Sequence, residues 1–187
     1  MNDTKNDATT TITLEFQTSG KLADRGVTIV EQSNIDQLSS RGYGIIENKT
    51  LTLTFYEALY LQEKGMLTIT NKKNTPVNFQ TLLHTYQLID ENAWVNYIVY
   101  RDIRSRGYIA REGFGIGTEF RVYERGTYGK NPATYMILGT QEGKPLNINT
   151  LSDILQQCQN QKKELIIAVI NRRGEIVYYS LSQLTLK

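Results

Sequence analysis

The stretch Tyr97–Gly126 reads YIVYRDIRSRGYIAREGFGIGTEFRVYERG, and it decides the fold of the chain. Its first residues belong to a helix that runs from about Ala93 to Arg106, because the apolar residues of this segment keep helical spacing. Gly107 ends the helix. The segments YIAREGFGIG and TEFRVYERG, which follow, are typical of strands. The stretch therefore predicts a helix followed by the first strands of a sheet.

The residues after this stretch complete the second half of the chain. A strand, TYMILGT, leads to a helix from Thr150 to about Gln161, for which Thr150 and Asp153 form the cap. The strands ELIIAVI and EIVYYSLSQL come last, and the turn NRRG joins them as a hairpin. This order predicts an α+β fold, with helices packed on a mixed sheet, for a C-terminal domain over residues 91–187.

The first half, residues 1–90, predicts a small N-terminal α/β domain. TITLEF, VTIVE and MLTIT have the patterns of strands. One helix is expected to begin at Ser33 with a capping-box-like start. A better-marked helix begins where Thr54 caps the chain, with Glu57 three residues on. A third helix is expected over Asn78–Leu88.

The composition is that of an ordinary globular protein. With 187 residues, of which 40% are hydrophobic and 21% charged, the chain is long enough for one domain or for two small ones that share an interface. The single cysteine, Cys158, excludes an internal disulfide and a cysteine-based metal cluster. No run approaches the roughly 20 apolar residues that cross a bilayer, and the polar residues 1–10 are expected to form a frayed tail rather than a signal segment. We therefore expect a cytoplasmic protein.

Arginines gather between Arg101 and Arg125. This segment holds six arginines and four acidic residues, so its surplus of two positive charges equals the net charge of +2 of the whole chain. Guanidinium groups grouped in this way indicate contact with the phosphates of a nucleic acid. The alternative is a solvated helix face and strand edge coated with mixed charges. The candidate phosphate-binding residues are Arg101, Arg104, Arg106 and Arg111.

Other residues with chemical potential have structural explanations. The only histidine, His84, lies in the predicted helix TLLHTYQL, where a packed or half-exposed residue is more common than a catalyst. The glycines of GFGIG lie between two strands, whereas a phosphate-binding loop lies between a strand and a helix. The carboxylates lack metal-ligand spacing, so no metal site is predicted. Trp94 is expected to be a core anchor of its helix.

Three stretches, RSRGY, GFGIGTEFRVYERG and KKELIIAVINRRGEIVYY, resemble in their order the landmarks of the archaeal tRNA-intron splicing endonucleases. The resemblance is strongest from about Trp94 to Tyr179, and no motif of the first half is specific. It implies that Tyr123 corresponds to the tyrosine that takes the proton of the ribose 2′-hydroxyl. It also implies that Lys163 corresponds to the lysine that stabilises the charged transition state. The implied reaction leaves 2′,3′-cyclic phosphate and 5′-hydroxyl ends, and it needs neither a metal nor a cofactor.

The chain departs from the family pattern at two positions. The family's histidine, the general acid for the leaving 5′-oxygen, corresponds to Pro132, and the arginine that stacks on a bulged base corresponds to Gln156. Proline offers no proton, and loss of a positioned general acid typically lowers a rate by a factor of about 10² to 10⁴. Tyr123 and Lys163 also have ordinary structural interpretations, on a sheet edge and at a helix end. These departures predict that this chain alone does not cleave RNA.

We therefore interpret the chain as a structural, non-catalytic subunit of a tRNA-splicing endonuclease. The resemblance implies a catalytic partner subunit in a dimer of heterodimers. It also implies a precursor tRNA with a bulge-helix-bulge motif, which the four arginines named above would contact. Because an apolar edge strand invites pairing, the last strand is expected to join subunits by burying Ile176, Tyr178 or their neighbours. The resemblance adds a second subunit contact, through the loop in which Glu142 is the only acid.

Two alternative functions stay open at this point. The first is an active RNA endonuclease that uses Tyr123 and Lys163 with a non-standard acid. The second is an RNA-binding scaffold that kept the fold outside any nuclease complex. A cleavage assay on a bulge-helix-bulge RNA, with and without a catalytic partner, distinguishes the three.

Overall fold

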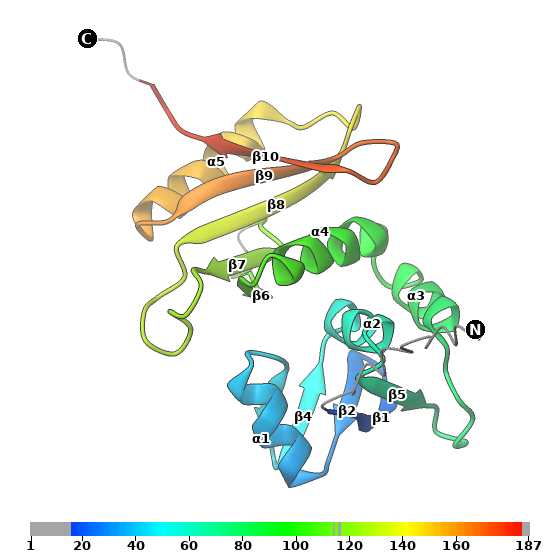
Figure 1. The fold of residues 1–187 in the computed structure, drawn as a ribbon. Coiled ribbons are helices and arrows are strands. Elements are labelled where there is room, and N and C mark those ends of the chain that lie inside the picture. Colours follow the sequence, from blue (N-terminus) through cyan, green and yellow to red (C-terminus); the bar gives the residue numbers. More distant parts are fainter. Residues whose placement is uncertain (1–15, 114, 116, 185–187) are drawn as a thin grey trace, which may run out of the picture.

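The computed structural model describes residues 16–113, 115 and 117–184. Across these residues it contains two five-stranded sheets and five helices (Figure 1). The predicted α+β class is confirmed, with an N-terminal domain built on one sheet and a C-terminal domain built on the other. The expected tail over residues 1–10 lies outside the described residues, as does the expected strand TITLEF except for its last residue.

The N-terminal domain alternates short strands with helices. In chain order it contains β1 (Thr18–Ala23), β2 (Gly26–Ile29), α1 (Gln32–Ser40), β3 (Ile45–Glu47), β4 (Thr50–Leu53), α2 (Phe55–Glu63), β5 (Leu67–Thr70) and α3 (Phe79–Gln87). The strand order is β3-β4-β2-β1-β5, in which β1 and β5 are parallel and the other pairs antiparallel. α1 packs near β3 and β4, and α2 packs against β2 and β5.

Of the two helix caps predicted from local sequence in this domain, one is confirmed and one is wrong. α2 begins after Thr54 as predicted, because the Thr54 hydroxyl accepts from the amide of Glu57 while the Glu57 carboxylate accepts from the amide of Thr54. The capping box predicted at Ser33 is wrong. Glu31 is the N-cap of α1 without a side-chain cap, and Ser33 lies inside the first turn, where its hydroxyl donates to the Glu31 carboxylate.

The C-terminal domain contains the helix and strands predicted from the opening stretch. In chain order it contains α4 (Ala93–Ser105), β6 (Ile109–Glu112), β7 (Phe120–Tyr123), β8 (Tyr135–Gln141), α5 (Ile148–Asn160), β9 (Glu164–Ile170) and β10 (Ile176–Leu181). The strand order is β10-β9-β8-β7-β6, with β8 and β9 parallel and the other pairs antiparallel. The sheet is therefore mixed, and the predicted hairpin between the last two strands is confirmed.

The two helices of this domain lie on opposite faces of the sheet. At Gly139 of β8 the backbone comes so close to α4 that an added Cβ would lie 3.0 Å from a methyl of Val95. Met136, three residues earlier, packs on the other face with Ile154 and Cys158 of α5. Since side chains alternate along a strand, each strand residue can be assigned to the α4 face or to the α5 face.

Two expectations for these helices are wrong. The side chain of Asn147 accepts the amide hydrogens of Asn149 and Thr150, so Asn147 rather than Thr150 is the N-cap of α5. Trp94 is not a core anchor, because it is 41% exposed. Its ring lies beside that of Tyr97, with 5.7 Å between the centroids.

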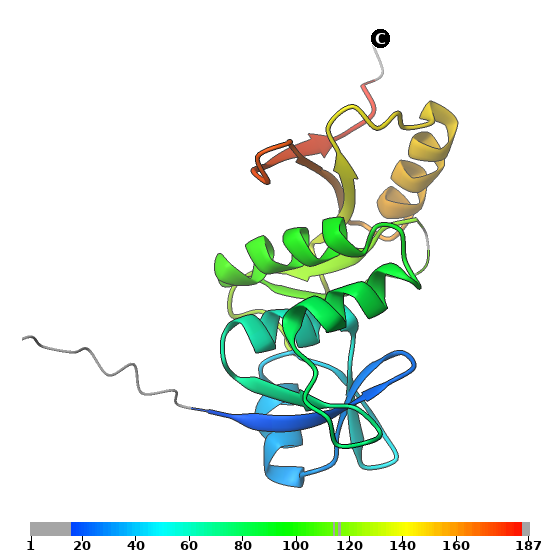
Figure 2. The same ribbon diagram turned by 90° about the vertical axis from the view of Figure 1, so that its right-hand side faces the viewer.

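Helices α2, α3 and α4 lie between the two sheets (Figure 2). Aromatic rings interlock there: Tyr100 of α4 contacts Tyr56 and Tyr60 of α2 at centroid distances of 4.9 and 5.9 Å. The ring of Phe120, from β7, meets Tyr56 edge-on at 5.1 Å. Buried residues of both domains form one continuous cluster, so the two domains share a core.

Candidate functional site

The sheet register brings the candidate catalytic positions into one row. Val122 of β7 pairs with Tyr135 of β8, and Tyr135 pairs with Glu164 of β9. One step further, the Thr134 amide donates to the Val122 carbonyl at 3.0 Å, and the Glu164 amide donates to the Thr134 carbonyl at 3.0 Å. Tyr123 and the residue before Glu164, which is Lys163, therefore flank Thr134 at the same end of the sheet.

The side chains in this row make contacts of their own. The Lys163 ammonium donates to the carbonyl of Ala133 at 2.8 Å, and its side chain is half-buried. The half-buried ring of Tyr123 lies edge-on to Tyr128, with 5.0 Å between the centroids. Pro132 is exposed in the loop between β7 and β8, directly before the residue that holds Lys163. Tyr123, Pro132 and Lys163 thus come from three segments to one end of the sheet.

For cleavage by 2′-hydroxyl attack the family resemblance expects a base, a cation and a general acid at this end. A phenol and an ammonium are present, but proline supplies neither a proton nor a donor. The only histidine of the chain, His84, is exposed on α3 in the N-terminal domain. Gln156 is exposed on α5. The described residues contain no group of metal-ligating side chains that could hold an ion, nor a helix long and apolar enough to cross a membrane.

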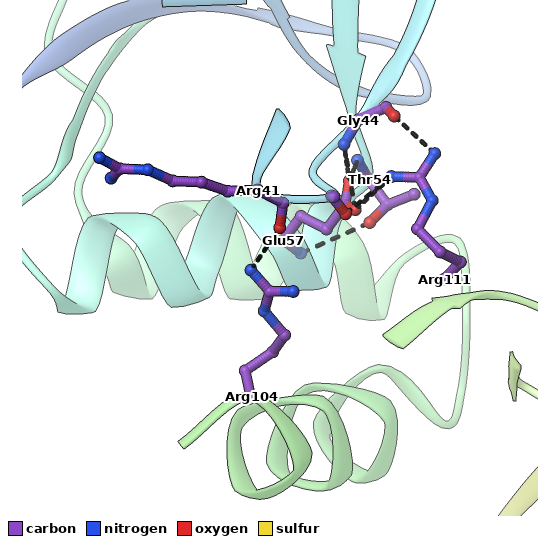
Figure 3. A network of polar contacts seen from close by, with 7 residues as sticks. Arg41, Gly44, Thr54, Glu57, Arg104 and Arg111 are labelled. Atoms are coloured by element: carbon purple, nitrogen blue, oxygen red, sulfur yellow. Dashed lines mark hydrogen bonds and ion pairs between the residues drawn. The ribbon is translucent and has the colours of Figure 1, made fainter. Parts of the chain in front are cut away.

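Arg104, predicted to bind RNA, lies between the domains. Its guanidinium stacks on the ring of Tyr43, with 4.0 Å from Cζ to the ring centroid. It also donates to the carbonyl of Arg41 at 3.1 Å (Figure 3). Tyr43 and Arg41 belong to the N-terminal domain, whereas Arg104 belongs to α4. This arginine therefore holds the loop after α1 against α4.

Arg111 makes a second contact between the domains. From β6 its guanidinium donates to the carbonyls of Gly42 and Gly44 at 3.0 and 2.6 Å, and it lies 3.4 Å from the carboxylate of Glu57 (Figure 3). Only 12% of the Arg111 side chain and 3% of the Glu57 side chain are exposed. The pair is separated by 54 residues in the sequence, so no local pattern could have predicted it.

The Glu57 carboxylate is satisfied from several directions. It accepts from the amide of Thr54 at 2.9 Å and from the amide of Gly44 at 3.1 and 3.2 Å. Burial raises the pKa of Glu57 above its usual value, while Arg111 and the amide donors oppose that shift. This network gives Arg104 and Arg111 structural roles, and their contact with RNA stays a prediction.

The other two predicted arginines lie at the surface of α4. Arg101 is 3.5 Å from the carboxylate of Glu63, with 40% of its side chain exposed. Arg106 is bound to Asp102, one helical turn earlier, at 2.7 Å, with 55% of its side chain exposed. Both guanidinium groups reach solvent and could still meet phosphate, so RNA contact stays a prediction for them too.

On the last strand the neighbours of Ile176 and Tyr178 are the exposed apolar residues. β10 is an edge strand, and its Ile176 and Tyr178 face α4, where the Tyr178 hydroxyl donates to the carboxylate of Asp102 at 2.7 Å. The neighbouring side chains point to the other face, and Val177 and Tyr179 are 48% and 55% exposed. An interface at Ile176 and Tyr178 stays a prediction, but the apolar surface of the strand lies at Val177 and Tyr179.

The loop that contains Glu142 is anchored to its own domain. The Glu142 amide donates to the carbonyl of Ile170 at 2.8 Å, and its side chain is exposed. Lys144 reaches the start of α4, where its ammonium lies 3.1 Å from the side-chain oxygen of Asn92 and 3.7 Å from the carboxylate of Glu91. The loop thus holds Glu142 outward, and the role predicted for it in subunit contact is not tested by these contacts.

Comparison with known proteins finds relatives over most of the chain. A family model of the tRNA intron endonuclease N-terminal domain matches residues 18–83, and one of the tRNA intron endonuclease catalytic C-terminal domain matches residues 93–178. A tRNA-splicing endonuclease of Methanococcus vannielii is 33% identical over 166 residues, which cover 89% of this chain and 94% of that protein. One of Methanothermobacter thermautotrophicus is 32% identical over 168 residues, 88% of this chain and 96% of that protein. One of Pyrococcus horikoshii is 29% identical over 168 residues, 90% and 95% respectively.

Proposed function

Since the chain belongs to the tRNA intron endonuclease family, we propose that it works as the structural subunit of a tRNA-splicing endonuclease. In this role the chain is a folded copy of a catalytic subunit, and a catalytic partner performs the cleavage. The substrate of the assembly is precursor tRNA with a bulge-helix-bulge motif. Its products carry 2′,3′-cyclic phosphate and 5′-hydroxyl ends.

The exposed proline at position 132 carries this proposal. Pro132 lies in the loop that joins Tyr123 to the strand beside Lys163, where the family resemblance expects a histidine. An alkoxide leaving group needs a proton from a group within hydrogen-bond reach, and proline has none to give. The contact of Lys163 with the Ala133 carbonyl supports a structural use of this lysine, because it anchors the loop.

The uncovered face of β10 supports assembly with a partner. Val177 and Tyr179 expose large apolar surfaces on an edge strand, which is the arrangement that invites a second chain. We expect the equivalent strand of a partner subunit to pack here about a two-fold or pseudo-two-fold axis. Ile176 and Tyr178 contribute from the inner face by fixing the strand against α4. Glu142 adds a weaker, salt-sensitive contact between dimers, because a single exposed carboxylate gains little in water.

A reconstituted cleavage reaction tests the catalytic half of the proposal. The chain is combined with a catalytic subunit of the family, and cleavage of a bulge-helix-bulge RNA is followed under single-turnover conditions. The chain alone gives no cleavage. In the complex, Tyr123→Phe and Lys163→Ala keep the rate within about threefold of the parent, because removing a group that is idle in the transition state leaves the barrier unchanged. The corresponding tyrosine of the catalytic partner, changed to Phe, is the matched control and lowers the rate.

The opposite result would support the second candidate function, an active endonuclease on this chain. The observation that favours it is the gathering of Tyr123 and Lys163 at one sheet end. In that case Tyr123→Phe in the complex, with the fold intact, costs roughly a hundredfold in rate, as removal of a general base does. Such a loss would reject the structural-subunit proposal.

Assembly is tested separately by substitutions on the exposed residues. Val177→Lys places a charge in the apolar interface, so it abolishes binding to the partner while the free chain keeps its unfolding midpoint. Ser180→Lys is the control. Ser180 is exposed and lies on the same strand, but its side chain points to the α4 face, so this variant still binds the partner. Glu142→Lys shifts tetramer to dimer on size exclusion, more strongly at low salt. Full-affinity binding by Val177→Lys contradicts the proposed interface.

A further inference from the structure

A hollow between α4 and the C-terminal sheet is lined by arginine and tyrosine side chains. Its volume is about 320 Å³, which is in the range of pockets that hold small ligands. Four aliphatic side chains from α4, β7, β8 and β9 form its floor. The remaining lining residues are Arg106, Tyr108, Arg125, Tyr135 and Tyr178.

Both lining arginines lie over lining tyrosines. The Arg125 guanidinium carbon is 5.2 Å from the ring centroid of Tyr108, and that of Arg106 is 5.8 Å from the ring centroid of Tyr178. The first pair comes from the β6–β7 end of the sheet and the second from α4 and β10. Planar groups therefore line the hollow from two sides, and flat aromatic ligands such as nucleobases stack on groups of this kind.

The Arg125 guanidinium at the rim of the hollow is open to an anion. Among the described residues no ion pair to Arg125 is found. Arg106 uses Nε and one terminal nitrogen for Asp102, at 2.7 and 3.3 Å, so its other terminal nitrogen stays available to a second acceptor. Glu124 is the acidic residue on the far side, where the Tyr135 hydroxyl lies 3.4 Å from its carboxylate. Planar rings beside an arginine that makes no ion pair among the described residues suit a phosphate attached to an aromatic base.

We propose that this hollow binds one nucleotide of single-stranded RNA, with the base stacked among the tyrosines and the phosphate on Arg125. The hydroxyls of Tyr178 and Tyr135 already face the carboxylates of Asp102 and Glu124. Recognition therefore rests on stacking and charge, and it is tolerant of base identity. The proposal rests on the proposed function only in taking RNA as the substrate of the assembly.

The position of the hollow gives the bound nucleotide a role in substrate placement. Val122 and Arg125, which line the hollow, flank Tyr123 in the chain. Because side chains alternate along a strand, Tyr123 points to the α5 face while Val122 points to the α4 face. An RNA strand with one nucleotide in the hollow passes the end of β7 close to the row of Tyr123 and Lys163. The hollow thus holds a nucleotide that flanks the sheet end.

A titration of the full chain alone tests this binding. We would follow amide chemical shifts on addition of 5′-AMP, 5′-UMP, adenosine and inorganic phosphate at low salt. We expect saturable binding of both nucleotides in the millimolar range, with shifts around Tyr108 and Tyr178. Adenosine and phosphate bind at least about tenfold more weakly, since each lacks one half of the recognition. Arg125→Ala, an exposed position, weakens nucleotide binding by about tenfold, and so does Tyr135→Leu. Arg172→Ala, in the exposed β9–β10 turn, leaves it unchanged.

Several outcomes would overturn the proposal. These are no saturable binding by the folded chain, equal affinity for phosphate and nucleotides, and equal affinity of the parent and Arg125→Ala. Insensitivity to nucleotides combined with protection of the hollow by the partner subunit would mean that a protein segment occupies it. The titration contains neither a partner subunit nor precursor tRNA, so the two proposals can fail separately. A chain that binds nucleotides but does not support cleavage in the reconstituted complex contradicts the proposed function and leaves nucleotide binding in the hollow supported. A chain that supports cleavage in the complex but binds no nucleotide contradicts binding in the hollow and leaves the proposed function supported.

Discussion

The network around Glu57 and the sheet end around Tyr123 differ in how completely their polar groups are partnered. Glu57 is 3% exposed in its side chain and accepts from two backbone amides as well as meeting Arg111. At the sheet end, Lys163 donates to one backbone carbonyl and Pro132 is exposed to solvent. A buried charge must be partnered for the chain to fold, whereas a solvent-facing catalytic residue can be lost without cost to the fold. The proposed loss of catalytic groups at the sheet end is therefore compatible with an intact domain contact.

The largest expected effect on stability comes from breaking the contact between the two domains at Arg111. Arg111→Met leaves the Glu57 carboxylate buried without its cation, and we expect the free energy of unfolding to fall by about 3 kcal/mol. The value lies at the low end for a broken buried pair because the amides of Gly44 and Thr54 still donate to the carboxylate. The loss is larger at pH 8 than at pH 5, since burial already raises the pKa of Glu57 and removal of Arg111 raises it further. Urea unfolding at both pH values measures it.

A double variant sharpens this result. Glu57→Gln removes the charge that needs a partner, so Glu57→Gln combined with Arg111→Met destabilises less than the sum of the two single changes. Arg172→Met, at an exposed turn, is the control and changes stability by less than about 0.5 kcal/mol. A loss of that small size in Arg111→Met itself would mean that the buried pair contributes little to the fold.

The same contrast explains how much could be predicted from the sequence. The capping box of Thr54 and Glu57 was predictable because both partners lie within one turn. The contact of Glu57 with Arg111 was not, because it depends on how two domains dock. The sheet end lies between these cases. The resemblance pointed to Tyr123, Pro132 and Lys163 together. The strand register brings Tyr123 and Lys163 to one end of the sheet, and Pro132 lies in the loop beside them.

Local signals failed where tertiary structure chose among alternatives. Trp94 is a residue type that is common in protein cores. In the structure, however, α4 turns Val99 and Tyr100 inward with no exposed surface, and Trp94 lies beside that packed side. Thr150 was a reasonable cap, yet Asn147 three residues earlier caps the helix instead. The periodicity predicted that these helices exist, whereas their rotation and first residue depended on contacts that sequence spacing does not encode.

A smaller effect on stability is expected at Glu119. Its carboxylate is less completely hydrogen-bonded than that of Glu57, but the residue is more buried than Pro132 at the sheet end. It is half-buried, and its carboxylate accepts from the amide of Gly139 at 2.8 Å. Burial raises the pKa of Glu119 from 4.5 to about 7. The folded state then binds the proton more tightly than the unfolded state, so this contribution to stability is present below pH 4.5 and is lost as the pH rises to about 7.

Glu119→Gln should remove this pH dependence. The amide oxygen of Gln can still accept from Gly139, and the variant has no charge to bury. We expect the variant to gain stability relative to the parent from pH 5 to pH 8, measured by urea unfolding. Glu112→Gln, at an exposed position of β6, serves as the control and shows a smaller change. Parallel stability curves for the parent and Glu119→Gln would contradict the assigned proton uptake.

The smallest effect is expected at the sheet end itself. Lys163→Ala removes one hydrogen bond, to the carbonyl of Ala133 in the loop that carries Pro132. A net contribution of about 1 kcal/mol is typical of such a bond, so the free energy of unfolding should fall by that amount or less. Lys162→Ala, the exposed neighbour, is the control for loss of charge. Because Lys163 anchors the loop locally, the amides of residues 130–134 should exchange hydrogen faster while those of the Glu57 network do not change. Faster exchange at Gly44 and Thr54 would show that the two regions are coupled, and the contrast between a solvent-facing sheet end and a buried domain contact would then fail.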